Sequence, residues 1–80
     1  MFSQYKSAYS DPFTITPSDS TYLSKPTNGG IYVGGAGTMV VVLHDGTTVS
    51  FTCVAGTVIP VIAIRVNSTG TTATGLVGLA

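Results

Sequence analysis

The chain carries few residues that could perform chemistry, and their spacing matches no catalytic pattern. His44 and Asp45 form the one neighbouring pair of the kind found in hydrolytic triads. Adjacent residues of a strand point to opposite faces, and none of the eight serines stands out as a nucleophile, so a solvated turn is the better interpretation. Asp11, Asp19 and Asp45 are widely separated and the chain has no glutamate, which leaves paired acid–base catalysis unsupported. We predict no catalytic residues and no enzymatic activity.

Three further motifs also have structural interpretations that outweigh a chemical one. Cys53 is the only cysteine, and it shares a strand face with Val49 and Phe51, so we predict a buried, inert thiol that binds no zinc. The glycine cluster at residues 29–37 lacks the Lys-Ser or Lys-Thr and the helix of a phosphate site, so we predict tight bends or close subunit approach. The Asn-Ser-Thr sequon at residues 67–69 is better interpreted as a turn. We therefore predict no cofactor and no metal.

From Gly30 onward the residue types are those of β-strands. Val, Ile and Thr dominate, and turn residues recur every eight to twelve positions. Asp45-Gly46 predicts a two-residue type I′ hairpin turn, which needs positive φ at both central residues. The fold class is therefore all-β, a small antiparallel β-sandwich or barrel with an extended N-terminal arm. We predict strands at residues 13–16, 31–33, 38–44, 47–54, 58–67 (interrupted by Pro60) and 72–79.

The N-terminal part differs in composition from the rest of the chain. Residues 1–28 contain five of the seven aromatic residues and three of the four prolines, with few aliphatic residues. We predict an extended arm over residues 1–12 and a single β domain over residues 13–80. Aromatic residues at positions 2, 5, 9 and 13 also fit one side of a helix, which the surrounding Ser and Asp-Pro residues disfavour.

Candidate interaction residues are the aromatic residues of this region, Tyr32, and the single charge of a long apolar strand. This charge belongs to Arg65, which either reaches the solvent edge or pairs with an aspartate, and the sequence does not decide between the two. The candidate interaction residues are Phe2, Tyr5, Tyr9, Phe13, Tyr22, Tyr32 and Arg65.

Two predicted strands are apolar on both faces. Met39–Leu43 is apolar at five consecutive positions and Val61–Ile64 at four, although the connections are too short for parallel crossovers. A second sheet of the same chain or a neighbouring subunit must cover the second face. We favour the subunit, because so short a chain cannot easily provide both sheets.

Composition supports assembly and argues against several other classes of partner. Only 8% of the 80 residues are charged, against a usual ~25%, and the net charge is zero, so the surface does not repel copies of itself. Three scattered basic residues cannot supply a nucleic-acid footprint. The apolar runs are far shorter than the ~20 residues of a membrane span, and the N-terminus has no secretory pattern. We predict a homo-oligomer that binds neither nucleic acid nor membrane and folds in the cytosol of its maker.

Four segments resemble, in order, a family of small head proteins of tailed phages, prophages and gene transfer agents called spike base proteins. They are ITPSD at 15–19, PTNGGIYVGGAG at 26–37, VAGTVIPV at 54–61 and TGTTAT at 69–74. The resemblance covers residues 13–80, whereas the arm has no counterpart. It implies a virion structural protein without catalytic activity, placed on the capsid exterior, in some members at fivefold vertices, where it holds a spike or fibre.

The leading hypothesis is therefore a spike base or decoration (cement) protein made in the bacterial host cytoplasm. Its implied partners are further copies of itself as a trimer or pentamer, the major capsid protein, and a spike or fibre protein. The alternative is a carbohydrate-binding or adhesin-like β module, in which Tyr5, Tyr9, Tyr22 or Tyr32 stacks on a sugar.

Overall fold

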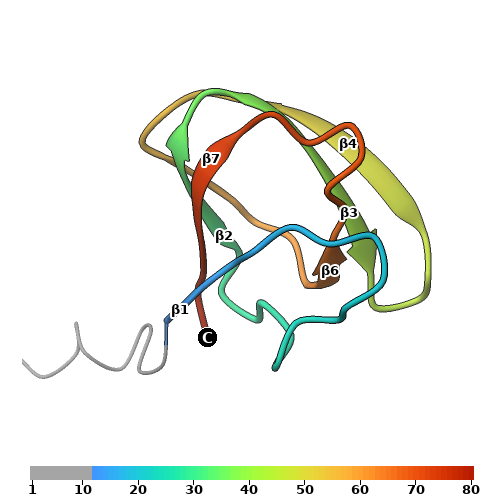
Figure 1. Cartoon of the computed structure of the whole chain (residues 1–80). Coiled ribbons are helices and arrows are strands. Elements are labelled where there is room, and N and C mark those ends of the chain that lie inside the picture. The colour runs from blue at the N-terminus through green and yellow to red at the C-terminus, as the bar shows by residue number, and fades with distance from the viewer. Residues whose placement is uncertain (1–11) are drawn as a thin grey trace, which may run out of the picture.

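Residues 12–80 of the chain, which this computed structural model describes, form two packed antiparallel sheets and no helix (Figure 1). Sheet A has the strand order β1-β7-β2-β5 and sheet B the order β4-β3-β6. The predicted all-β antiparallel fold is confirmed, and of the two predicted forms, sandwich or barrel, the chain adopts the sandwich. The strands are β1 (Phe13–Thr14), β2 (Ile31–Gly35), β3 (Gly37–Leu43), β4 (Thr48–Cys53), β5 (Thr57–Ile59), β6 (Ala63–Val66) and β7 (Thr74–Gly78).

The hydrophobic core lies between the two sheets and follows the two-residue period of the strands. In β2, Ile31 and Val33 are fully buried while Tyr32 between them is exposed. Met39 and Val41 of β3 are also fully buried and point inward from sheet B. In β4, Val49, Phe51 and Cys53 face the core and the Thr and Ser residues between them face outward, as the sequence predicts.

The β3–β4 hairpin is present, but its predicted two-residue type I′ turn is wrong. The amide of Leu43 donates to the carbonyl of Thr47 at 2.7 Å, and the amide of Gly46 donates to the carbonyl of Leu43 at 2.9 Å. Within this loop only Gly46 has positive φ, at 92°, and among the described residues every positive φ belongs to a glycine. This pattern is that of a three-residue loop, a type I turn followed by a left-handed glycine. Asp45 keeps ordinary backbone angles because its Oδ1 accepts a hydrogen bond from the Thr47 amide at 3.0 Å.

The predicted strand at residues 58–67 is two strands that belong to different sheets. β5 pairs with β2 in sheet A, and β6 pairs with β3 in sheet B. The chain crosses between the sheets at residues 60–62, where the Val61 amide donates to the Ile59 carbonyl at 2.9 Å and closes a tight turn around Pro60. Proline cannot donate to a strand ladder, so it ends the pairing in sheet A and redirects the chain.

The first part of the β domain joins the two sheets along one side of the sandwich. After β1, the Ile15 amide still donates to Leu76 of β7, and the chain then runs beside β6 (Figure 1). There the amides of Ser18, Leu23 and Thr27 donate to carbonyls of β6 at 2.8 to 3.1 Å. We call this side, formed by residues 15–27, the closed side. This stretch forms no strand of its own, although three of its amides donate to β6.

The expectation that a neighbouring subunit covers the second face of β3 is also wrong. Val42, which points away from the core, is 6% exposed within the single chain. Arg65 of β6 stands directly opposite it in the register, and Gly70 lies against Val40. Sheet A covers the inner face, so one chain supplies cover on both faces. Arg65 of β6 and the loop that contains Gly70 provide the outer cover.

A sharp corner between β2 and β3 carries the chain from sheet A to sheet B, as the glycine cluster predicts. Gly37 has φ of 153°, and a Cβ placed on it would lie 2.6 Å from the amide nitrogen of Ala73. Only glycine fits both the backbone angle and the space. The tight corner allows consecutive strands to lie in opposite sheets.

Candidate functional site

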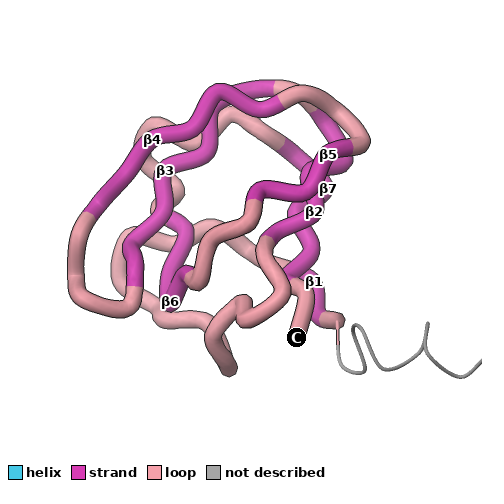
Figure 2. The backbone as a smooth tube through the Cα atoms, turned by 180° about the vertical axis from the view of Figure 1, so that it is seen from behind, coloured by secondary structure: helices cyan, strands magenta, loops and turns pink. Residues whose placement is uncertain are grey.

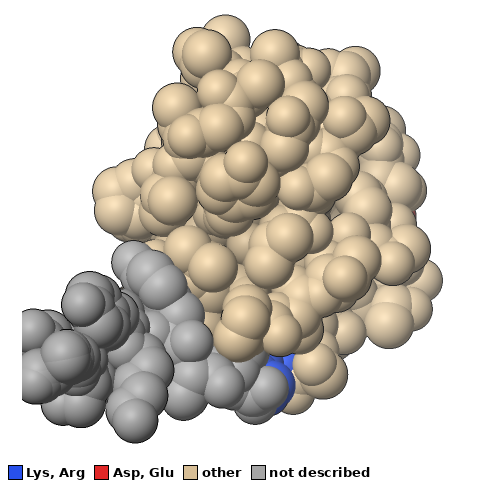
Figure 3. All heavy atoms as spheres, turned by 90° about the vertical axis from the view of Figure 1, so that its left-hand side faces the viewer, with Lys and Arg blue, Asp and Glu red and all other residues tan. Residues whose placement is uncertain are grey.

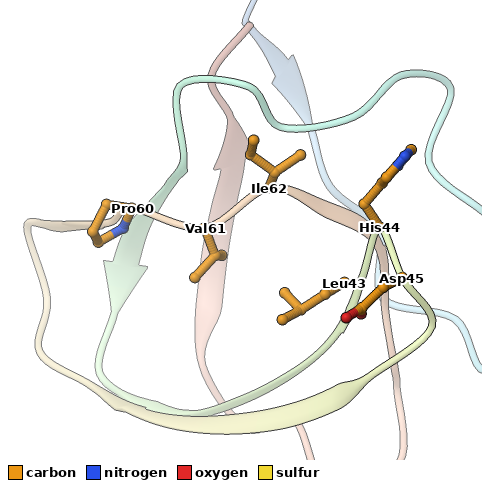
Figure 4. A pocket seen from close by; sticks show the side chains of 6 residues that line it. All are labelled: Leu43, His44, Asp45, Pro60, Val61 and Ile62. Carbon is orange, nitrogen blue, oxygen red and sulfur yellow. The ribbon is translucent and has the colours of Figure 1, made fainter.

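The residues that could perform chemistry are kept apart by the fold. His44 and Asp45 point away from one another (Figure 4). Hydrogen bonding from Thr47 lowers the pKa of the Asp45 carboxyl, so it stays ionised. Cys53 is 3% exposed and burial raises the pKa of its thiol, which matches the predicted inert cysteine.

Within residues 12–80 no group of three or more potential metal ligands comes together. The same part of the chain contains no helix long and apolar enough to cross a membrane.

Asp19 has a structural role at the closed side. Its Oδ1 accepts a hydrogen bond from the Thr69 amide at 3.0 Å, and its Oδ2 accepts one from the Thr69 hydroxyl. These bonds lower the pKa of the carboxyl. Asp19 therefore fastens the segment after β1 to the loop between β6 and β7, and the predicted turn at residues 67–69 forms this loop.

Arg65 lies on the outer face of sheet B. Its Nε donates to Asn67 Oδ1 at 3.0 Å, and its guanidinium carbon lies 5.2 Å from the centre of the Tyr22 ring. The side chain is half-buried, and Tyr22 is 60% exposed. Of the two alternatives left open by the sequence, the arrangement resembles the first, with the guanidinium near solvent and held by an aromatic face.

Phe13 belongs to the inner surface of the sandwich rather than to an exposed patch. It stands opposite Gly78 in the register, and a Cβ on Gly78 would lie 2.5 Å from the Phe13 ring. Lys25 Nζ lies 5.8 Å from the centre of the same ring. Phe13 thus packs against the core, with a cation above it. Phe2, Tyr5 and Tyr9 lie outside the described residues.

Tyr32 occupies the centre of an apolar row across the outer face of sheet A. The register pairs Thr14 with Val77, Val77 with Tyr32, and Tyr32 with Val58. Tyr32 is 39% exposed and Val58 is 44% exposed. Figure 3 views the molecule from the side of sheet A, and apart from one small basic area at the lower edge the described surface is uncharged. A face of this kind is typical of protein contact surfaces.

A second apolar region lies on the side opposite to the closed side. Here β4 and β5 are the outermost strands of their sheets, and within residues 12–80 no strand pairs with their outer edges (Figure 2). We call this the open side. It contains an open groove of about 460 Å³, the edge groove, in which Leu43 and Val61 point toward the middle (Figure 4). The edge groove is lined by Leu43, His44, Asp45, Pro60, Val61 and Ile62.

Most residues of these two apolar regions were not among the candidates derived from sequence. Tyr32 was named, but Val58 and Val77 become its neighbours only through strand pairing. Pro60 did signal the interruption of a strand. That the chain crosses between the sheets there, and leaves Ile62 48% exposed, depends on the positions of both sheets and cannot be inferred from Pro60 alone. Residues far apart in sequence form each region, so local patterns could not find them.

Residues 12–80 thus form a small β-sandwich with two exposed apolar regions, and no polar centre is assembled among them. No protein-family profile matches the chain, and no curated protein does. A chain in the solved structure "Capsid of native GTA particle computed with C5 symmetry" is 42% identical, with a TM-score of 0.82. The match covers 90% of this chain and 83% of that one. The chain therefore belongs to the same family, that of capsid-related proteins of phages and gene transfer agents (GTAs).

Proposed function

We propose that the protein is a non-enzymatic structural component of a virion, located on the exterior of the capsid as a head spike base or a decoration protein. The observation that carries the proposal is the 42% identity, over 90% of the chain, to a component of a GTA capsid structure. The sequence segments that resemble spike base proteins support the narrower assignment. Synthesis in the bacterial host cytoplasm is part of the proposal.

The proposed mechanism is geometric. Copies of the chain associate as a trimer or pentamer, because a capsid offers threefold and fivefold positions to which a cyclic oligomer can be matched. The apolar row centred on Tyr32 contacts the shell of the major capsid protein. Its low charge favours this role, since burying it removes little hydration from charged groups. A spike or fibre protein binds to the assembled oligomer, and the arm, residues 1–12, contributes to attachment.

The alternative of a carbohydrate-binding module gains no support from the placement of the tyrosines. Tyr32 lies on the outer face of sheet A, whereas Tyr22 contacts Arg65 on the outer face of sheet B. Two tyrosines that lie at different sheets do not form one stacking platform for a sugar. We therefore advance no second function.

Capsid binding tests the proposal directly. The protein is mixed with particles assembled without it, and co-sedimentation is measured for the unaltered chain and for Val58→Asp. We expect the unaltered chain to sediment with the particles and Val58→Asp to lose at least tenfold in affinity, because a charge then enters an apolar contact. Ser50→Asp, at an exposed position on the outer face of sheet B, is the matched control and should bind normally. An unaltered chain that stays in the supernatant would contradict the proposed function.

A further inference from the structure

Two features of the open side indicate that it binds a partner segment. Ile62 is 48% exposed, and Leu43 and Val61 beside it are only half-buried, although all three line the edge groove. Beside the groove, β4 presents a six-residue free edge without a charged residue or a proline. Proteins usually protect such edges with charge, proline or a covering segment, because free backbone groups pair with added strands.

The chain contains one segment with suitable chemistry, which is the arm. Its three aromatic residues, Phe2, Tyr5 and Tyr9, have almost no aliphatic neighbours in sequence with which to form a core. Aromatic side chains are the usual anchors of protein contacts, since each inserts a large apolar area into a pocket. The arm also carries Lys6, whose charge is opposite to that of Asp45 at the groove.

The starting point and the length of the arm determine which grooves it can reach. The arm leads into β1, which is at the opposite edge of sheet A from β5, three strand spacings or roughly 14 Å away. The twelve residues of the arm reach at most about 40 to 43 Å. When two copies meet head to tail, the edge that carries the arm on one copy faces the open side of the next. Contacts of this kind repeat around a ring and close it.

We propose that the arm of one copy binds in the edge groove of a neighbouring copy. At least one of the arm aromatic side chains inserts between Leu43 and the link that carries Val61 and Ile62. This contact completes the open side of the neighbour, as residues 15–27 complete the closed side within each chain. The inference rests on the self-association proposed above and names the surfaces that produce it.

Photo-crosslinking in the full chain tests the location of the contact. A benzophenone amino acid replaces Phe2, Tyr5 or Tyr9, one position at a time, and each protein is mixed with an excess of isotopically labelled unaltered chain before illumination. Mass spectrometry then identifies the attached residue and its copy. We expect at least one position to attach to Leu43, Val61 or Ile62 of the labelled chain. Attachment within the same chain, or to other residues only, would overturn the proposal.

A double-mutant cycle tests the energetic coupling. Phe2, Tyr5 and Tyr9 are replaced together by serine, Ile62 is replaced by glutamate, and the two changes are combined. Sedimentation velocity gives the association constant of each variant, and circular dichroism verifies the fold. We expect each change to weaken association at least tenfold and the combination to weaken it no further, because both remove one contact. Thr52→Glu, at an exposed position on the outer face of sheet B, is the control and should leave association unchanged.

The outcomes separate this inference from the proposed function. If the chain forms an oligomer whose association constant is insensitive to both changes, or to Ile62→Glu alone, the arm does not occupy the groove and only the inference fails. If the two losses add fully, the arm and the groove bind different partners, and the inference also fails. If the unaltered chain is monomeric at all concentrations and on the capsid, the proposed self-association fails together with the inference.

Discussion

The closed side and the open side of the sandwich differ in how the edges of the two sheets are covered. On the closed side, residues 15–27 donate backbone hydrogen bonds to β7 and β6, so the edges of both sheets are joined within one chain. On the open side, the outer edges of β4 and β5 have no partner strand among the described residues, and Ile62 remains half-exposed. Among the described residues, the segment 15–27 covers one side of the sandwich only. Stability should therefore depend mainly on the closed side and association on the open side.

The largest effect on stability is expected at Thr27, the fully buried threonine of the closed side. Its hydroxyl donates to the Val61 carbonyl at 2.8 Å and accepts from the Ala63 amide at 2.9 Å. Thr27→Val keeps the shape but leaves both backbone groups without a partner, which should lower the free energy of unfolding by about 2 to 4 kcal/mol. Chemical denaturation measures this loss. Thr27→Ser keeps the hydroxyl and should lose clearly less, so equal losses would show that packing rather than hydrogen bonding dominates.

A smaller effect is expected at Gly46, in the hairpin that places Leu43 and Asp45 at the open side. Its φ of 92° disfavours other residues, yet a Cβ there would meet nothing within 4 Å. Gly46→Val should therefore lower the free energy of unfolding by about 1 to 3 kcal/mol through backbone strain alone. Thermal melts of Gly46→Val and Gly46→Asn provide the comparison. Asparagine tolerates positive φ, so a melt as low as that of the valine variant would contradict this explanation.

The contact between Tyr22 and Arg65 should contribute still less, although it belongs to the closed side. The guanidinium carbon is 5.2 Å from the ring centre, and the ring is largely exposed. Tyr22→Ser should cost about 0.5 to 1 kcal/mol, the range for an exposed cation–π contact. Tyr22→Phe keeps the aromatic face and should match the unaltered chain in denaturant titrations. A loss above about 2 kcal/mol for the serine variant would mean that Tyr22 covers part of the core.

The smallest effect is a pH dependence from Asp19. Hydrogen bonds from Thr69 lower the pKa of this carboxyl in the folded chain below its ordinary value, so the folded state favours the charged form. The stabilisation is present above the ordinary pKa and is lost as pH falls through the lowered pKa. We expect the difference in melting temperature between the unaltered chain and Asp19→Asn to shrink between pH 5 and pH 2. A difference that stays constant over this interval would assign the effect to lost hydrogen-bond geometry instead of charge.

Local patterns were sufficient for the strand content and for the faces of individual strands. The alternation of Val49, Phe51 and Cys53 with polar residues predicts which side of β4 is buried, because the side-chain period of a strand is two. The same reasoning predicts a turn near Gly46. It does not determine the length of that turn, since the side-chain hydrogen bond of Asp45 to Thr47 lets Asp45 avoid positive φ.

Residue types and local patterns therefore predict an antiparallel all-β chain of zero net charge with a buried thiol. Long-range pairing sets which strands share a sheet, makes Pro60 a crossing between sheets, and leaves residues 15–27 on one side while no described strand pairs with the edges of the other. The physical reason is that strand pairing joins backbone groups that are distant in sequence. Tyr32, Val58 and Val77 form one row through two separate ladders, and no local periodicity records a contact of that kind.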